Sequence, residues 1–250
     1  MQVIVPSSKD LEHQLTPLVG LAWRVVETQE TAATRVITRN AEEQSRLEQL
    51  LDNSKPSIPP ECERLSYLLM TPFRYPPLEY GSRFGSQWER GIFYGAKEQE
   101  TALAETAVYL WLFQQGPEDM GPLAEINDSR TVFSVRLRTR KGCDLCAPTF
   151  AKLKPALTQE DSWNFSQKIG SSLREAGAEF FWYPSARAEN GANAAVLSPK
   201  AFASRQPSAQ ELWLVRLTRE LCWFGRADGY YYEFERSQFL HNGKLQHPCL

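Results

Sequence analysis

The chain has 250 residues, of which 42% are hydrophobic, 23% charged and 12% aromatic. This is the composition of an ordinary globular protein, and it excludes collagen-like, low-complexity and broadly disordered classes. Lys and Arg (28) nearly balance Asp and Glu (30), which leaves a formal net charge of −2. This balance gives no global electrostatic reason to expect a nucleic acid or an anionic membrane as a partner.

The most apolar stretch of the sequence is residues 102–113, which contains Glu105. It is shorter than the roughly 20 apolar residues that a membrane span needs, so no membrane segment is expected. The first residues lack a basic segment followed by a long apolar core, so no signal peptide is expected. The five cysteines are scattered and odd in number, which argues against a disulfide framework. These observations predict a cytoplasmic protein.

The first predicted elements lie in the N-terminal quarter of the sequence. Residues 18–26 are apolar and rich in β-formers around Arg24, which is typical of a strand. Residues 41–52 have the leucine spacing and acidic start of a helix. Three prolines within residues 53–61 then require a loop. Residues 38–64 are therefore predicted to form a helical, proline-rich insertion.

The middle of the sequence predicts a strand, a loop, a second strand and a helix. Residues 65–70 form an apolar run that we interpret as a strand, and residues 71–87 form a long loop dense in Pro, Gly, Arg and aromatic residues. Residues 91–95 predict a short buried strand. A helix is expected from about residue 97 to 115, with Gly116 and Pro117 at its end.

The second half of the sequence predicts more strands than helices. Apolar residues alternate over 131–137, as in a half-buried strand. Thr158 is a candidate N-cap for a helix that runs to about Ala176, with Gly177 just past its end. Further strands are expected at residues 180–183, 194–197, 211–218 and 230–234, although the pattern of residues 211–218 also fits a helix.

Strands and helices mix in this order without a strict βαβ rhythm, which favours an α+β fold over a doubly wound parallel sheet. We predict one domain over residues 1–250, with a mixed sheet core and flanking helices. Its core spans about residues 20–205, the helical insertion about 38–64, and the C-terminal strands lie within 206–240.

Glu105 is the most unusual residue of the predicted helix, because nearly all of its neighbours in the sequence are apolar. A carboxylate that is buried without a partner is costly, so it calls for a cation or a wet cavity. The alternative is a glutamate on a narrow solvated edge of the helix.

Two arginines are candidate partners for a charged ligand. The loop 81–85 carries Arg83 between two glycines, which permit close backbone approach, and a guanidinium suits phosphate. Arg24 lies within an apolar strand. Either arginine alone can be a surface residue whose stem covers apolar neighbours. Together with Glu105, and with Tyr94 on the strand at 91–95, they indicate a polar site.

Three further motifs are weaker signals. Ser185 follows a strand and a proline, where its hydroxyl can point into a cleft or merely serve the turn. Cys143 and Cys146 have a spacing that suits zinc or redox exchange, but no second ligand pair follows, so no metal is expected. Glu98 and Glu100 superficially match the Glu-x-Glu pair of many ADP-ribosyltransferases, but we prefer to interpret them as the acidic start of a helix.

Two common kinds of site are not indicated. His13, His241 and His247 lie near the two ends of the chain, which argues against triad hydrolases and histidine-based metal sites. The sequence has no Walker phosphate loop, and no glycine-rich dinucleotide fingerprint follows a strand, which argues against the classical nucleotide-binding folds.

Six segments, in the same order over about residues 20–205, resemble those of the RES domain family, the toxins of bacterial Xre–RES toxin–antitoxin pairs. Phe84 and Gly85 stand where the family has Trp and Asn. The six segments are Leu21-Ala-Trp-Arg-Val-Val26, Gly81-Ser-Arg-Phe-Gly85, Ile92-Phe-Tyr94, Thr101-Ala-Leu-Ala-Glu105, Tyr183-Pro-Ser185 and Val196-Leu-Ser-Pro199.

The resemblance implies an ADP-ribosyltransferase-like fold and the consumption of NAD as a substrate in a bacterial cytoplasm, without a metal. The nicotinamide–ribose bond would be cleaved by hydrolysis or phosphorolysis, or ADP-ribose would be transferred to a protein. Nicotinamide leaves as a neutral base, so this step needs no histidine as general acid, only stabilisation of an oxocarbenium-like ribose and of the pyrophosphate.

The resemblance also implies roles for five residues. Glu105 would hold the ribose hydroxyls and the developing positive charge, and Arg24 and Arg83 would bind the pyrophosphate. Tyr94 would stack on a ring, and Ser185 would hydrogen-bond to the ribose or the nicotinamide.

The partner implied by the resemblance is a cognate Xre-type antitoxin that covers the cleft, with no direct contact to nucleic acid. Its carboxylates would complement the two arginines. The alternative outside the enzyme class is a catalytically silent relative that acts as a binding module.

Overall fold

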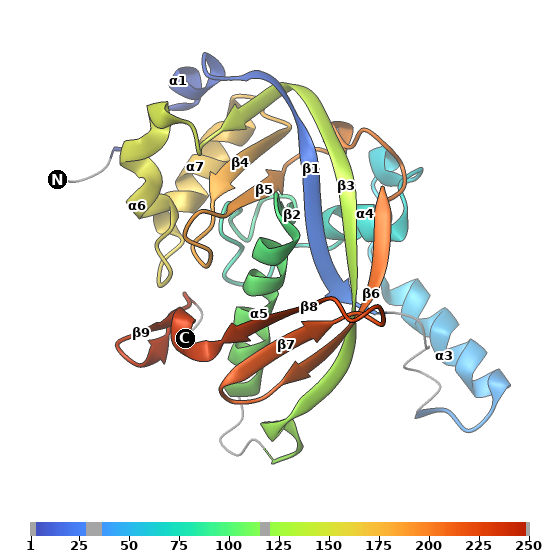
Figure 1. The fold of residues 1–250 in the computed structure, drawn as a ribbon. Coiled ribbons are helices and arrows are strands. Elements are labelled where there is room, and N and C mark those ends of the chain that lie inside the picture. Colours follow the sequence, from blue (N-terminus) through green and yellow to red (C-terminus); the bar gives the residue numbers. More distant parts are fainter. Residues whose placement is uncertain (1–3, 29–36, 116–120, 249–250) are drawn as a thin grey trace.

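The computed structural model describes residues 4–28, 37–115 and 121–248, and within them eight strands form one sheet (Figure 1). The strands are β1 (Thr16–Glu27), β2 (Phe93–Ala96), β3 (Ile126–Asp144), β4 (Phe180–Pro184), β5 (Ala192–Val196), β6 (Ala209–Leu217), β7 (Leu221–Gly225) and β8 (Tyr231–Glu235). Their order in the sheet is β1-β2-β5-β4-β3-β6-β7-β8, and β1 also pairs with β3. This extra pairing closes β1, β2, β5, β4 and β3 into a ring of five hydrogen-bonded strands.

Helices other than α3 pack against the sheet, and a small hairpin lies near the end of the described chain. The helices are α1 (Ser8–Glu12), α3 (Ala41–Ser54), α4 (Tyr67–Arg74), α5 (Gln99–Gln115), α6 (Lys154–Leu157) and α7 (Asn164–Glu175). Short 3-10 turns occur at Pro60–Cys62, Gly121–Ala124, Pro148–Leu153, Pro199–Ala201 and Arg236–Phe239. The hairpin joins β9 (Leu240–His241) to β10 (Lys244–Leu245). The predicted α+β class is confirmed.

The apolar core is divided among three clusters. Each of the five ring strands contributes buried side chains to one of them, which α4 completes with Leu69, Met70 and Phe73. A second cluster joins the ring to α1, α6 and α7. The third lies between α5 and the strands β6–β8. Because α5 packs against β1, β2, β5 and β8, it connects the ring to the C-terminal strands.

Two predicted elements are wrong in type or extent. Residues 65–70 are not a strand, because Leu69 and Phe73 recur at helical spacing and α4 buries them in the core. A short apolar run fits either structure until its packing partner is known. Thr158 does not begin a helix. Its hydroxyl donates to the carbonyl of Lys154 at 2.9 Å, so it ends α6, and α7 starts only at Asn164.

The other predicted strands and the helices at 41–52 and 97–115 are confirmed with shifted ends. The predicted helix end at Gly116 and Pro117 lies outside the described residues. The helix α3 has no buried residue and projects away from the sheet in Figure 1. Among the helices within the described residues, none is both long and apolar enough to cross a bilayer.

Candidate functional site

A cavity of about 420 Å³ lies where the ring, α5, the loop 78–83 and the C-terminal segment meet. This volume is typical of small-molecule sites. Four of the five residues singled out in the sequence line it, namely Arg24, Arg83, Tyr94 and Glu105. Segments that are far apart in the sequence are therefore brought to one cavity, as the predicted polar site requires.

Glu105 lies on α5, half-buried at the cavity wall. Its Oε1 accepts hydrogen bonds from the Ser185 hydroxyl and from the Asn193 side-chain amide, each at 2.7 Å. Within the described part of the chain, no hydrogen bond reaches Oε2. One carboxylate oxygen is thus fixed by the protein, while the other remains for a ligand.

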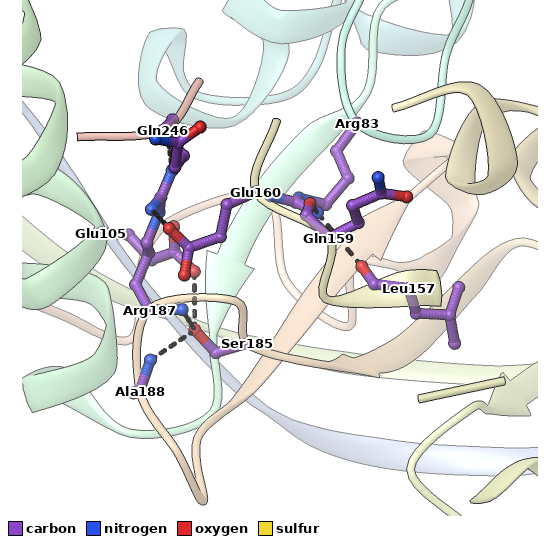
Figure 2. Close-up of polar contacts among 9 residues, drawn as sticks. All are labelled: Arg83, Glu105, Leu157, Gln159, Glu160, Ser185, Arg187, Ala188 and Gln246. Carbon is purple, nitrogen blue, oxygen red and sulfur yellow. Dashed lines mark hydrogen bonds and ion pairs between the residues drawn. The ribbon is translucent and has the colours of Figure 1, made fainter. Parts of the chain in front are cut away.

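Ser185 does not line the cavity; it lies just after β4 and is joined to Glu105 by its hydroxyl (Figure 2). Its Oγ accepts hydrogen bonds from the backbone N–H of Arg187 (3.0 Å) and of Ala188 (3.1 Å). These two donors orient the hydroxyl so that its own proton points to Glu105. The geometry therefore makes Ser185 a positioning residue for the carboxylate.

Asn193 is a second positioning residue, and the sequence analysis missed it. It lies on β5, is only 4% exposed and lines the cavity. Its Nδ2 is committed to Glu105, while its Oδ1 is buried with no partner among the described residues. The sequence did hold one signal for this residue, because Asn193 is a polar amide within a strand of alanines and a valine.

Arg24 places a half-buried positive charge at the cavity. Its guanidinium donates to the carbonyl of Tyr94 at 2.7 Å and lies over the Phe93 ring, 4.9 Å from the centroid. No described carboxylate pairs with it, and its Nε is buried without a partner. Burial lowers the pKa of Arg24 to about 10, so the group is still cationic at neutral pH and unmatched in charge.

Tyr94 holds the loop 81–85 in place. Its hydroxyl accepts from the backbone N–H of Phe84 at 3.0 Å and hydrogen-bonds to the Ser82 hydroxyl at 2.9 Å. Burial raises the pKa of Tyr94 to about 12, so it stays protonated at neutral pH. Gly81 begins this loop with φ +72°, where a Cβ would lie 2.3 Å from the Gly85 carbonyl oxygen, so a side chain is excluded there.

Arg83 points from this loop to the linker between α6 and α7. Its Nη1 donates to the carbonyls of Leu157 (3.1 Å) and Gln159 (3.0 Å), as Figure 2 shows. The loop itself is tied to α7 by Gln167, whose side-chain amide donates to the carbonyls of Tyr80 and Ser82. Arg83 is thus at the cavity, held by the carbonyl of the buried Leu157 at the end of α6 and by that of Gln159 in the linker.

Arg187 is a third arginine at the cavity and was not identified from the sequence. Its side chain is 3% exposed and forms an ion pair with Glu160 of the linker. Its Nη2 donates to the carbonyl of Gln246 at 2.6 Å. The arginine therefore joins the Ser185 turn, the linker and the C-terminal segment (Figure 2).

The remaining motifs lie away from this cavity. Glu98 and Glu100 line a separate cavity of about 530 Å³. Cys143 is buried on β3, where burial raises the pKa of its thiol to about 12, and Cys146 is exposed. Among the described residues, no group of three His, Cys, Asp or Glu side chains is placed to hold a metal ion.

The comparison with protein families gives a match for residues 58–216, which is more than half of the chain, to the RES domain. The chain belongs to the RES domain family. The resemblance seen in the sequence motifs is thereby confirmed. The comparison with curated proteins found no match.

A solved structure gives an independent view of the fold of this RES domain. A chain of the M. tuberculosis MbcT–MbcA toxin–antitoxin complex is similar to it with a TM-score of 0.50 and 13% sequence identity. The similarity covers 85% of this chain and 92% of that chain. At this identity, what the two chains share is the fold.

Three cavity residues lie outside the segment that matches the RES domain. Arg24 and Val25 precede it on β1, and His247 follows it near the end of the described chain. The terminal position of His247 argued against a histidine-based site, yet its ring lies against Trp163 and Tyr109 at the cavity. Burial, with Arg187 and Arg83 nearby, lowers the pKa of His247 to about 4.

Proposed function

We propose that this RES domain consumes NAD by cleaving its nicotinamide–ribose bond. The observation that carries the proposal is the Glu105 carboxylate, which is fixed through Oε1 in a cavity that also holds the unmatched cation of Arg24. A carboxylate beside a sugar and a buried guanidinium beside a pyrophosphate are the complements of the charges that develop in this reaction.

The reaction breaks the bond between the nicotinamide nitrogen and C1′ of the ribose. The electron pair leaves with the nitrogen, which turns the cationic ring into neutral nicotinamide and leaves an oxocarbenium-like ribose. Glu105 Oε2 stabilises that positive charge and accepts from the ribose hydroxyls. Water then adds to C1′ and loses a proton to give ADP-ribose. Alternatively, phosphate adds to the same carbon to give ADP-ribose phosphorylated there.

The other residues act around this centre. Arg24 and Arg83 bind the pyrophosphate, and Arg24 contributes most because one described carbonyl accepts from its guanidinium, whereas two accept from that of Arg83. Ser185 and Asn193 act through Glu105 by orienting it. Tyr94 lends its ring to the cavity wall, and its hydroxyl sets the position of the loop that carries Arg83.

We further propose that the chain is one RES-type domain with an ADP-ribosyltransferase-like core, and that it acts as a toxin with a cognate antitoxin. The toxin–antitoxin character of the complex with a similar fold supports this pairing. An antitoxin carboxylate that enters the cavity would take the place of the pyrophosphate at Arg24 and Arg83. An Xre-type protein encoded beside the chain is the first partner to test, by whether the complex loses NAD binding.

The deciding experiment incubates the purified chain with NAD and follows free nicotinamide. Nicotinamide release that depends on the folded protein is the expected result. Product analysis in the presence and absence of phosphate then separates hydrolysis from phosphorolysis, and added cell proteins reveal ADP-ribose transfer. A folded chain that releases no nicotinamide with any of these acceptors contradicts the proposal. That result would favour the alternative, a catalytically silent relative that acts as a binding module.

A further inference from the structure

The last described residues form a segment, Leu245–Pro248, that we call the strap. It begins with the last residue of the β9–β10 hairpin, whose turn uses positive φ at Asn242 and Gly243. Leu245 is only 3% exposed and packs into the cluster between α5 and the C-terminal strands. The strap is therefore anchored in the core, although it lies beyond the part of the chain that matches the RES domain.

The strap is also anchored at the cavity. The Gln246 carbonyl accepts a hydrogen bond from the buried guanidinium of Arg187, which pairs at the same time with Glu160 of the α6–α7 linker. A buried arginine bound to both segments fixes the strap relative to the linker, because breaking either contact would leave a buried charge short of partners.

The strap brings an aromatic ring to the cavity wall. The His247 ring is edge-on to Trp163, with centroids 5.1 Å apart, and edge-on to Tyr109, with centroids 5.5 Å apart. All three residues line the cavity. With its lowered pKa, His247 is neutral at neutral pH. The three rings therefore form a continuous uncharged wall, which we call the aromatic wall.

The aromatic wall lies next to the catalytic carboxylate. Tyr109 follows Glu105 by four residues on α5, so the two side chains project from the same face of the helix one turn apart. In the proposed reaction the ribose is at Glu105, and the base is attached directly to that ribose. A flat ring leaving C1′ is thus within reach of the aromatic wall.

Resting on the proposed function, we propose that the strap completes the subsite for the leaving base, and that His247 packs against the nicotinamide ring together with Trp163 and Tyr109. The two segments that hold this subsite are locked by Arg187, so the subsite is preformed. The ADP-ribose part of the substrate contacts Arg24 and Arg83, and it is bound independently of the strap.

The test compares two ligands on the full chain by calorimetry. One is carbocyclic NAD, which retains the nicotinamide but cannot form the oxocarbenium ion. The other is ADP-ribose, which lacks the nicotinamide. In His247→Ala we expect roughly three- to tenfold weaker binding of carbocyclic NAD, the scale of one lost aromatic contact, and less than a twofold change for ADP-ribose. His241→Ala, an exposed histidine of the adjacent hairpin, is the matched control.

His247→Phe restores an aromatic ring and is expected to recover most of the affinity for carbocyclic NAD. Equal weakening of both ligands in His247→Ala, or no weakening of either, would overturn the strap subsite while leaving the proposed function intact. A wild-type chain that binds neither ligand would overturn both.

Discussion

Two sets of cavity residues differ in what holds them. The framework residues Arg24, Glu105 and Asn193 lie on β1, α5 and β5, so hydrogen-bonded secondary structure fixes their backbones. The loop residues Arg83, Arg187 and His247 lie outside those elements. Arg83 and Arg187 are tied through their side chains to other loops, and His247 packs against Trp163 and Tyr109.

The difference indicates a division of labour. Framework residues are placed to within the tolerance that a reacting centre requires. Oε2 of Glu105 remains for a ligand, and the cavity-lining guanidinium of Arg24 donates to a single described carbonyl. The loop residues are already bonded to carbonyls, to a carboxylate or to rings, so their contacts shape the cavity more than they supply unmatched charge. Substitutions in the framework are therefore expected to have the larger effects on catalysis and on binding, and substitutions in the loops the smaller ones.

The largest effect is expected at the centre of the framework. Glu105→Gln keeps the size of the side chain but removes the charge that stabilises the oxocarbenium-like state. Nicotinamide release should fall at least about a hundredfold, the scale of one preorganised electrostatic group, with unchanged thermal stability. Glu100→Gln, on the exposed first turn of the same helix, is the matched control and should retain activity. Near-normal turnover by folded Glu105→Gln would remove this residue from the mechanism.

A second framework variant tests the positioning of Glu105. Asn193→Asp replaces the amide donor with an acid whose oxygens face Glu105 Oε1. At pH 8 the two carboxylates repel each other, and activity should fall roughly thirtyfold. At pH 5 the introduced acid takes up a proton and again donates a hydrogen bond, so activity relative to the wild type should rise. If the activity of the variant relative to the wild type is the same at pH 8 and pH 5, Asn193 has a merely structural role.

The two arginines provide a direct comparison between framework and loop. Arg24→Lys should weaken NAD binding roughly tenfold, because the ammonium cannot reproduce the planar fork in a buried place. Arg83→Lys should cost no more than about threefold, since a lysine can still meet the carbonyls of the linker. Calorimetry on both variants, with thermal melts to check folding, gives the two numbers. Equal losses of NAD affinity in the two variants would show that the framework arginine contributes no more to binding than the loop arginine.

The smallest expected effect is a pH dependence of stability from a loop residue. His247 has a folded pKa of about 4 against an ordinary value of about 6.5. Stability from this group is therefore complete above pH 6.5 and is lost as the pH falls from 6.5 toward 4, because only the unfolded chain takes up the proton. The ring is half-buried and partly screened, so about 1 kcal/mol, or roughly 2–4 °C in Tm, is expected at pH 5.

His247→Phe supplies the comparison, because it keeps a ring and cannot titrate. Melting curves of both proteins at pH 7.5 and pH 5 should show a smaller loss in the variant. The same loss in both proteins would mean that other groups account for the acid sensitivity.

By itself, the sequence determined the α+β class, most strands, the family and four residues that line the cavity. These features depend on local patterns: alternation marks a strand, and a charge embedded in an apolar run stands out whatever surrounds it. Where the local pattern was ambiguous, as at residues 65–70 and at Thr158, the prediction failed, because the packing partner decides between helix and strand.

Only the tertiary structure decided which distant residues share the cavity. His247 and Arg187 have no unusual neighbours in the sequence, and Ser185 gave no sign that it would orient Glu105 rather than face a ligand. Their roles follow from the closure of the strand ring and from the return of the chain to α5 after β8. Such contacts join residues tens of positions apart, so no local pattern encodes them, and the cavity exists only once the sheet has closed.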